Sequence, residues 1–140
     1  MEINNKKAYF NYTVLKELEA GIELKGTEIK SIRKGSVDLK DSYIRIKNNE
    51  AFLINCYIEK YLEGNNFNHD VTRERKLLLH KKEIKKLYDS VTTEGLSLVP
   101  LKMYFKNGKA KVLVGLVKGK KLYDKRESIK KKDLERQNKL

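Results

Sequence analysis

Apolar residues recur at every second position along the first long segment of the chain. The positions that follow this period are Tyr12, Val14, Leu18, Ala20, Ile22 and Leu24. Lys16 is the one exception. Successive side chains of a strand point to opposite faces, so the pattern predicts a strand over 12–24 with one buried face. The next segment, TEIKSIRKG, predicts a short helix that Thr27 caps and Gly35 ends.

A hairpin is predicted where SYIRIKNNEAFLINCYI divides at Asn48-Asn49. Both flanks are rich in β-branched and aromatic residues, and asparagine tolerates a left-handed backbone. The positions expected to face inward on the second strand are Phe52, Ile54, Cys56 and Ile58. Cys56 is therefore expected to be a small core residue, since a reactive thiol needs exposure and a cationic neighbour.

The second half of the chain begins with a polar segment, YLEGNNFNHDVTRER, which predicts a loop, and KLLL then predicts a short strand. Apolar residues at helical spacing predict an amphipathic helix that ends before Gly95; they are Ile84, Leu87, Tyr88 and Val91. Two alternating runs over 99–105 and 110–116 flank Asn107-Gly108, which suits the type I′ turn of a hairpin. The single proline, Pro100, suggests an edge or the start of a strand.

The order of these elements favours a mainly β fold with added helices. Five or six strands, with a helix before the last hairpin, predict a small closed antiparallel β-barrel of the OB type with about three α-helices. We expect residues 1–117 to form this OB-like barrel. Residues 118–140 are expected to be a basic tail, disordered in the free protein.

Charge adds an expectation about partners. The 140 residues include 36% charged residues and carry a net charge of +13, and residues 118–140 contribute +6 of it from ten basic and four acidic residues. Such a balance favours nucleic acid first and an anionic membrane second. No apolar run approaches the roughly 20 residues that span a bilayer. We expect a soluble cytoplasmic protein that does not bind a membrane.

The sequence offers little material for catalysis. His69 and His80 are the only histidines and Cys56 the only cysteine, so no clustered metal ligands are visible. No glycine-rich phosphate loop is present. We therefore expect no enzyme activity, no metal and no cofactor.

Basic clusters interleaved with aromatic residues point to RNA. They occur in NNKKAYFNY, in TRERK and in KNGKAK. Lysine and arginine neutralise phosphates, whereas aromatic rings stack on unpaired bases. In the tail, Glu127–Lys131 and Glu135–Lys139 are helix-favouring pairs at i,i+4, so this segment is expected to become ordered when phosphates neutralise it.

Four blocks of the sequence resemble the SmpB family, the SsrA-binding proteins of bacteria. They are EAGIELKGTEIKSIRKG, KDSYIRIKNNEAFLIN, ERKLLLH and KGKKLYDKRESIK, in the family's order. The resemblance implies an OB-like fold and a non-enzymatic adaptor of trans-translation. Such a protein binds the tRNA-like domain of transfer-messenger RNA (tmRNA) and delivers it to ribosomes stalled on broken messages. Incomplete proteins are then tagged and the ribosomes rescued.

The resemblance also implies two sets of contact residues. The tmRNA-binding set is Asn5, Lys6, Lys7, Glu19, His69, Arg73, Lys76, Leu78 and Lys111. The set expected at the ribosomal decoding site and in the empty mRNA channel is Lys120, Lys121, Tyr123, Asp124, Lys125, Arg126, Lys130 and Lys131.

The implied partners are tmRNA, the ribosomal RNA of the small subunit, and elongation factor Tu through alanyl-tmRNA. A monomer is expected. Two alternatives stay open: a general single-stranded RNA-binding OB-fold or ribosome-associated protein, and a small RNA-processing enzyme. Preference for an L-shaped RNA over unstructured oligomers would separate the first alternative from the adaptor. Metal-dependent loss of intact RNA would indicate the enzyme.

Overall fold

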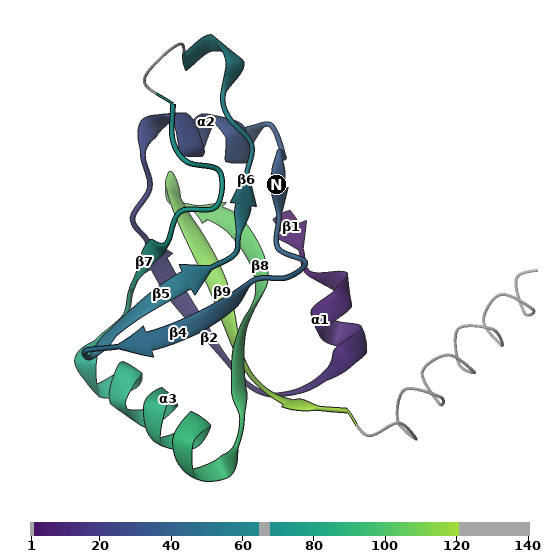
Figure 1. Cartoon of the computed structure of the whole chain (residues 1–140), viewed down its shortest axis with the longest axis vertical. Coiled ribbons are helices and arrows are strands. Elements are labelled where there is room, and N and C mark those ends of the chain that lie inside the picture. Colours follow the sequence, from purple (N-terminus) through teal and green to yellow (C-terminus); the bar gives the residue numbers. More distant parts are fainter. Residues whose placement is uncertain (1, 65–67, 121–140) are drawn as a thin grey trace, which may run out of the picture.

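A single antiparallel sheet of seven strands organises the molecule (Figure 1). The computed structural model describes residues 2–64 and 68–120. In sheet order, the strands are β1 (Glu2–Asn4), β8 (Ser97–Lys106), β9 (Lys109–Gly119), β2 (Tyr12–Ile22), β7 (Arg75–Leu78), β5 (Glu50–Ile54) and β4 (Tyr43–Lys47). The short strands β3 (Val37–Asp38) and β6 (Tyr57–Ile58) pair with each other. The helices are α1 (Lys6–Asn11), α2 (Gly26–Arg33) and α3 (Lys81–Glu94), with a 3-10 turn over Leu62–Gly64.

The predicted closed barrel is wrong, because the sheet stays open between β4 and β8. These two strands lie beside each other but do not pair. Part of the reason is that Asn5 already uses the β8 backbone here: its side-chain amide donates to the Pro100 carbonyl at 2.8 Å, and its backbone N–H donates to the Leu101 carbonyl at 2.9 Å. Pro100 has no N–H to offer. The mainly β class with three helices is confirmed.

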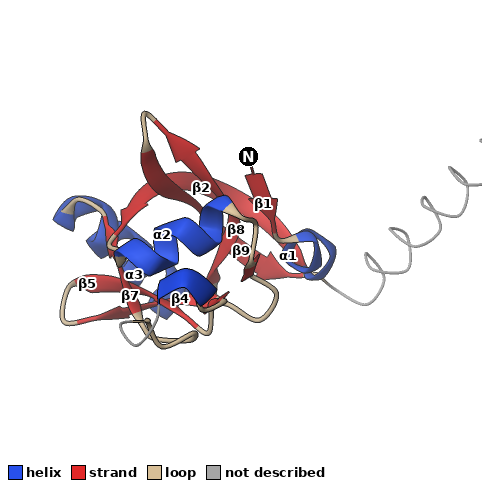
Figure 2. Ribbon diagram, turned by 90° about the horizontal axis from the view of Figure 1, so that it is seen from above, coloured by secondary structure: helices blue, strands red, loops and turns tan. Residues whose placement is uncertain are grey.

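The inner face of the sheet carries the main hydrophobic core. Ala20, Leu53, Leu77, Met103 and Val112 are all at most 1% exposed. The helices α2 and α3 add Ile32, Ile84 and Leu87 to the same core. In the view from above, α2 lies over the space that the strands enclose (Figure 2). A second, smaller core forms on the opposite face of β8 and β9, where Ala8 of α1 packs with Val99, Leu101 and Val117.

The long elements follow the sequence prediction closely. Both hairpins turn at the expected pairs, because Asn48, Asn49, Asn107 and Gly108 all have positive φ angles. The helix α3 ends at Gly95, whose φ of 66° is left-handed. Cys56 is buried, as expected.

Two local expectations are wrong. Thr27 does not cap α2: the helix begins after Lys25, whose backbone N–H donates to the Glu28 carboxylate at 2.8 Å. On β5 the inward residues are Ala51 and Leu53, so Phe52 and Ile54 face the other way. The reason is Asn55, whose φ of 58° shifts the phase before Cys56. The expected edge position of Pro100 is confirmed, because β8 pairs there with β9 alone and meets β1 only from Lys102 onward. The short elements β1 and α1 were not anticipated.

Candidate nucleic-acid interface

Four of the expected tmRNA-binding residues share the outer face of the sheet. In the strand register, Gly21 of β2 pairs with Lys111 on one side and with Leu78 on the other. Glu19 lies two residues from Gly21, and Lys76 lies two residues from Leu78. Because side chains alternate between faces, all four point away from the core. We call Glu19, Lys76, Leu78 and Lys111 the outer-face patch.

Glu19 lies in a network of polar side chains. It accepts a hydrogen bond from the Tyr104 hydroxyl and lies 3.6 Å from the Lys106 ammonium group. The Tyr104 hydrogen bond and the charges of Lys106 and Lys111 hold the pKa of Glu19 below its usual range. Burial and the neighbouring Glu19 carboxylate raise the pKa of Tyr104 to about 12. The carboxylate is therefore ionised at neutral pH and can accept hydrogen bonds from base amino or imino groups.

Leu78 gives the patch an apolar contact. Its side chain lies in the middle of the outer face and is 50% exposed. It packs against Gly21, where an added Cβ would lie 3.2 Å from the Leu78 Cβ. Lys76 lies beside it and forms an ion pair with Glu50 at 3.5 Å. The patch thus combines an exposed aliphatic side chain, suited to an unstacked base, with lysines suited to phosphates.

Three of the expected tmRNA-binding residues lie at α1, and one of them is buried whereas the other two are exposed. Asn5 is 3% exposed. Its amide donates to the Leu39 and Pro100 carbonyls, and its side-chain oxygen caps α1 through the Ala8 N–H. Any effect of Asn5 on RNA binding would act through the positions of Lys6 and Lys7. Both lysines are exposed, and Lys7 pairs with Asp41 at 2.9 Å.

The helix α1 reaches the same outer face as the patch. Its Ala8 packs with Leu101, and Leu113 packs partly buried against this small core. Leu113 pairs directly with Glu19. The two groups of predicted residues are therefore neighbours along β9.

His69 and Arg73 lie elsewhere and are engaged inside the protein. His69 is 1% exposed, with one ring nitrogen 2.9 Å from the Thr27 hydroxyl and the other 2.9 Å from the Ile58 carbonyl. Arg73 contacts the buried Glu28 carboxylate at 2.5 Å. Neither side chain joins the outer-face patch. Val71 fixes the same loop, since its carbonyl accepts from the Ile58 N–H at 2.9 Å and from the Arg75 guanidinium at 3.2 Å.

Sequence reasoning missed Tyr104 as part of the site. The sequence did contain a signal for Tyr104, because the two-residue turn at Asn107-Gly108 fixes which residues of the two hairpin strands pair. That register places Tyr104 opposite Lys111.

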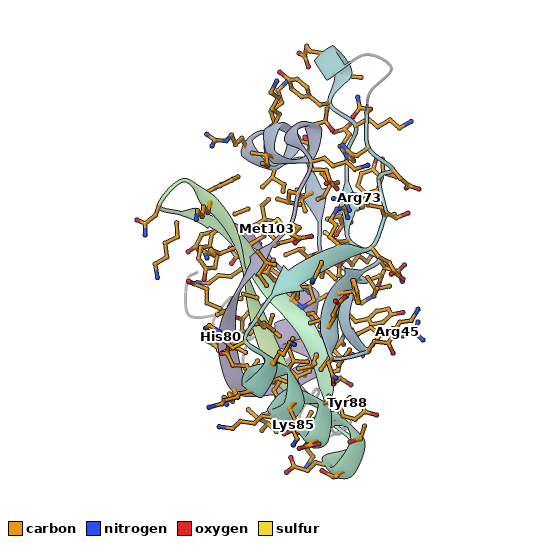
Figure 3. The ribbon with its side chains drawn as sticks, turned by 90° about the vertical axis from the view of Figure 1, so that its left-hand side faces the viewer. Arg45, Arg73, His80, Lys85, Tyr88 and Met103 are labelled. Atoms are coloured by element: carbon orange, nitrogen blue, oxygen red, sulfur yellow. The ribbon has the colours of Figure 1, made fainter. Side chains whose placement is uncertain are left out.

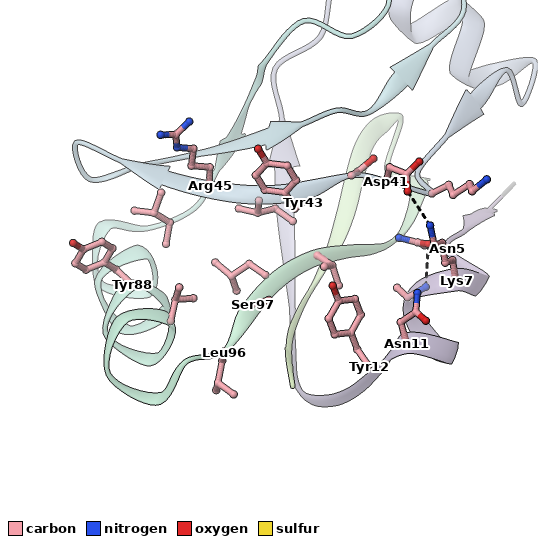
Figure 4. A pocket seen from close by; sticks show the side chains of 18 residues that line it. Asn5, Lys7, Asn11, Tyr12, Asp41, Tyr43, Arg45, Tyr88, Leu96 and Ser97 are labelled. Carbon is pink, nitrogen blue, oxygen red and sulfur yellow. Dashed lines mark hydrogen bonds and ion pairs between the residues drawn. The ribbon is translucent and has the colours of Figure 1, made fainter. Parts of the chain in front are cut away.

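A groove runs along the open seam between β4 and β8. It has a volume of about 690 Å³ and extends from α1 to α3 (Figure 4). Its rim carries Lys7, Asp41, Tyr43, Arg45 and Tyr88. Asn11 and Tyr12 lie at its α1 end, where the Asn11 carbonyl accepts from the Lys120 N–H at 3.0 Å.

Lys120 is the one residue of the expected ribosome-contact set that the structure describes. The others lie outside the described residues: Lys121, Tyr123, Asp124, Lys125, Arg126, Lys130 and Lys131. Most of the expected disordered tail falls in the same segment. The last described strand ends near α1, where Gly119 pairs with Tyr12 and the Lys120 N–H donates to Asn11.

Within residues 2–64 and 68–120, no cluster of three or more histidine, cysteine or acidic side chains could hold a metal ion. Burial raises the pKa of the Cys56 thiol to about 11, so this cysteine carries a proton at neutral pH. Among the described helices, none is long and apolar enough to cross a membrane.

Comparison with known proteins finds the same likeness over nearly the whole chain. The family profile described as "SmpB protein" matches residues 2–140. The SsrA-binding protein of Enterococcus faecalis is 57% identical over 133 residues, which cover 95% of this chain and 86% of that protein. The SsrA-binding protein of Shouchella clausii is 59% identical over 133 residues, covering 95% and 85%.

A solved structure described as "tmRNA-SmpB: a journey to the center of the bacterial ribosome" is similar in fold and in sequence. It superposes with a TM-score of 0.74 at 47% identity, and the match covers 91% of this chain and 94% of that one.

Proposed function

This chain belongs to the SmpB protein family, and from that membership we propose that it binds tmRNA and brings it to stalled ribosomes. It acts as an adaptor of trans-translation rather than as an enzyme. The relatives' printed name, SsrA-binding protein, and the tmRNA–SmpB ribosome structure support the RNA and ribosomal partners. Elongation factor Tu, reached through alanyl-tmRNA, and a monomeric state complete the proposal.

The observation that carries the RNA-binding role is the convergence on one face of Glu19, Leu78 and Lys111. These residues come from β2, β7 and β9, yet the register brings them together around Gly21. A lysine supplies the phosphate contact, a carboxylate accepts from a base edge, and a leucine packs on an unstacked base. We assign the tRNA-like domain of tmRNA to this patch, with Lys6 and Lys7 extending it.

The basic segment after Lys120 supplies the ribosomal half of the function. Its charge suits the phosphates of small-subunit ribosomal RNA. Tyr123 would stack on a ribosomal base, while Lys125 and Arg126 would hold phosphates near the decoding site. The remaining basic residues of the segment, Lys130 and Lys131 among them, would follow the empty mRNA channel. This segment would stand in for the missing codon–anticodon pairing.

Salt dependence tests the assignment of the patch. Each phosphate contact contributes slightly under one unit to the slope of log K against log salt. Lys111→Ala should lower the slope for the tRNA-like domain of tmRNA by about one unit. Leu78→Ala should weaken binding while leaving the slope unchanged, because it removes packing and no charge. Mobility-shift titrations at several salt concentrations measure both quantities.

Lys60→Ala is the matched control, since Lys60 is exposed on the loop after β6, away from the patch. It should change neither affinity nor slope by much. A Lys111 variant with the wild-type slope would remove Lys111 from the phosphate contacts.

A further inference from the structure

The first half of α3 carries an exposed lysine face that the outer-face patch does not include. It consists of Lys81, Lys82, Lys85 and Lys86, all exposed. At 100° per residue, these four positions fall on the side of the helix opposite Ile84 and Leu87, which enter the core. Figure 3 shows α3 with Lys85 and Tyr88, and His80 where the helix joins β7.

These lysines form no ion pair within the described residues, unlike other lysines of this protein, although Asp89 follows Lys85 at i+4 on the same side of the helix. Lys7, Lys34, Lys76, Lys102 and Lys106 each form an ion pair with a carboxylate. Over the described residues, no such pair involves a lysine of the α3 face. The acid in the first turn, Glu83, is engaged at the helix start, where it accepts the His80 N–H at 3.0 Å.

The arrangement works against the stability of the helix. Lys81 and Lys85, and likewise Lys82 and Lys86, are like-charged pairs at i,i+4, which destabilise a helix. All four also lie in its first two turns, where the helix dipole favours negative charge. A segment that breaks local rules with no compensating contact inside the protein is expected to meet a partner that supplies one. Here the missing group is an array of anions.

The lysine face adjoins the outer-face patch directly. A hollow of about 400 Å³ lies between the turn of the first hairpin, β7 and the start of α3. Its lining includes Lys76 and Leu78 of the patch together with His80 and Lys81. The surface therefore continues from the sheet onto α3, past Glu50 of the first hairpin, which lines the same hollow and pairs with Lys76.

We propose that the α3 lysine face binds the phosphate backbone of the same tRNA-like RNA that the outer-face patch contacts, an inference that rests on the proposed function. A helix rises 1.5 Å per residue, so lysines four residues apart are about 6 Å apart along the axis and can follow successive phosphates of one strand. The contact carries no base readout. It adds affinity that depends on salt and fixes the orientation of the RNA.

The test compares two variants of the full chain that lose the same charge. In the first, Lys81, Lys82, Lys85 and Lys86 are all changed to Gln, which keeps helix propensity. In the control, four exposed lysines without ion pairs in the described structure are changed instead, namely Lys16, Lys25, Lys40 and Lys60. Affinity for the tRNA-like domain of tmRNA is titrated between 50 and 200 mM salt.

The α3 variant should lose about two units or more of salt slope. A two-unit loss makes the affinity change over this fourfold salt range about 16-fold smaller than for the wild type. Its melting temperature should be unchanged or higher, because like-charge pairs have been removed. The control variant should keep most of the wild-type slope.

Equal slopes for the α3 variant and the wild type would overturn the inference while leaving the proposed function intact. Equal losses in both variants would also overturn it, because the effect would then follow net charge alone. A wild-type protein that did not prefer the tRNA-like domain would contradict the proposed function itself.

Discussion

Glu28 is a buried charge whose energetics can be tested at a single residue. Its side chain is fully buried, and it bonds both Arg73 and Arg75. Burial acts to raise the pKa of Glu28, but the hydrogen bonds from Arg73, the Lys25 N–H and Arg75 outweigh it and hold the pKa below its usual value. Arg75 also donates to the Cys56 carbonyl at 2.7 Å. The network therefore ties α2 to the loop before β7.

Replacing Glu28 by Gln should destabilise the protein by about 3–5 kcal/mol, because Arg75 would stay buried without a counter-charge. Urea unfolding measures the change. The matched control is Glu63→Gln, which removes an exposed ion pair with Lys34 and should cost at most about 1 kcal/mol. Equal losses for the two variants would show that the buried pair has no special weight.

The same variant has a predicted pH dependence. A carboxylate whose folded pKa is lowered contributes stability above its unfolded value, here about 4.5, and loses it as the pH falls through the folded pKa. The stability difference between wild type and Glu28→Gln should therefore be constant near neutral pH and shrink below about pH 4.5. Urea midpoints across this range measure it. A stability difference between the two proteins that grew on acidification would contradict a lowered pKa of Glu28.

The resemblance to a known family predicted which residues belong to one site, but not which of their side chains are exposed. Glu19, Leu78 and Lys111 were expected in one site, and the strand register now places them together. Asn5 and His69 were expected in the same site but are buried. Asn5 bonds residues 34 and 95 positions away, and no local pattern reveals such distant partners.

At the scale of elements, α1 is held on the outer face by the second, smaller core. The close approach that permits this packing occurs at Gly115 of β9. A Cβ at this position would lie 2.8 Å from the Cγ and Cδ1 atoms of Leu101, which is fully buried. Leu101 in turn carries the carbonyl that the Asn5 N–H binds.

Gly115→Ala should therefore cost about 1–3 kcal/mol of stability through overpacking. Gly119→Ala on the same strand is the control, because an added Cβ there meets no heavy atom within 4 Å. Thermal or urea unfolding compares the two. A Gly115 variant as stable as the Gly119 variant would mean that Leu101 can move aside freely.

The elements that sequence predicted well are those defined by local signals. Both hairpins and α3 carry their turn residues or caps within a few positions. The phase of β5 was wrong because the left-handed turn at Asn55 looks like one more step of the alternation. β1 and α1 have three and six residues, too short for a period to be visible. The barrel was wrongly expected to close, because Asn5, which occupies the β8 backbone at the open seam, comes from outside the strands.

At the scale of the whole molecule, we expect RNA recognition and action on the ribosome to reside in different parts of the chain. The outer-face patch, α1 and α3 belong to the described fold, and the basic segment follows β9 in the sequence. A chain ending at Lys120 should keep most of its affinity for tmRNA and no longer support tagging. A mobility-shift titration and an in vitro tagging assay measure the two activities. Loss of RNA binding on truncation would refute the separation.

The most direct measurement is the identity of the RNA that the protein selects. Affinity-tagged protein is recovered from a bacterial lysate, and the bound RNA is sequenced beside that of a variant with Glu19→Ala, Leu78→Ala and Lys111→Ala. We expect tmRNA to be strongly enriched over transfer RNA and ribosomal RNA with the wild type, and the variant to lose this enrichment. An RNA population that follows cellular abundance, unchanged in the variant, would contradict this expectation.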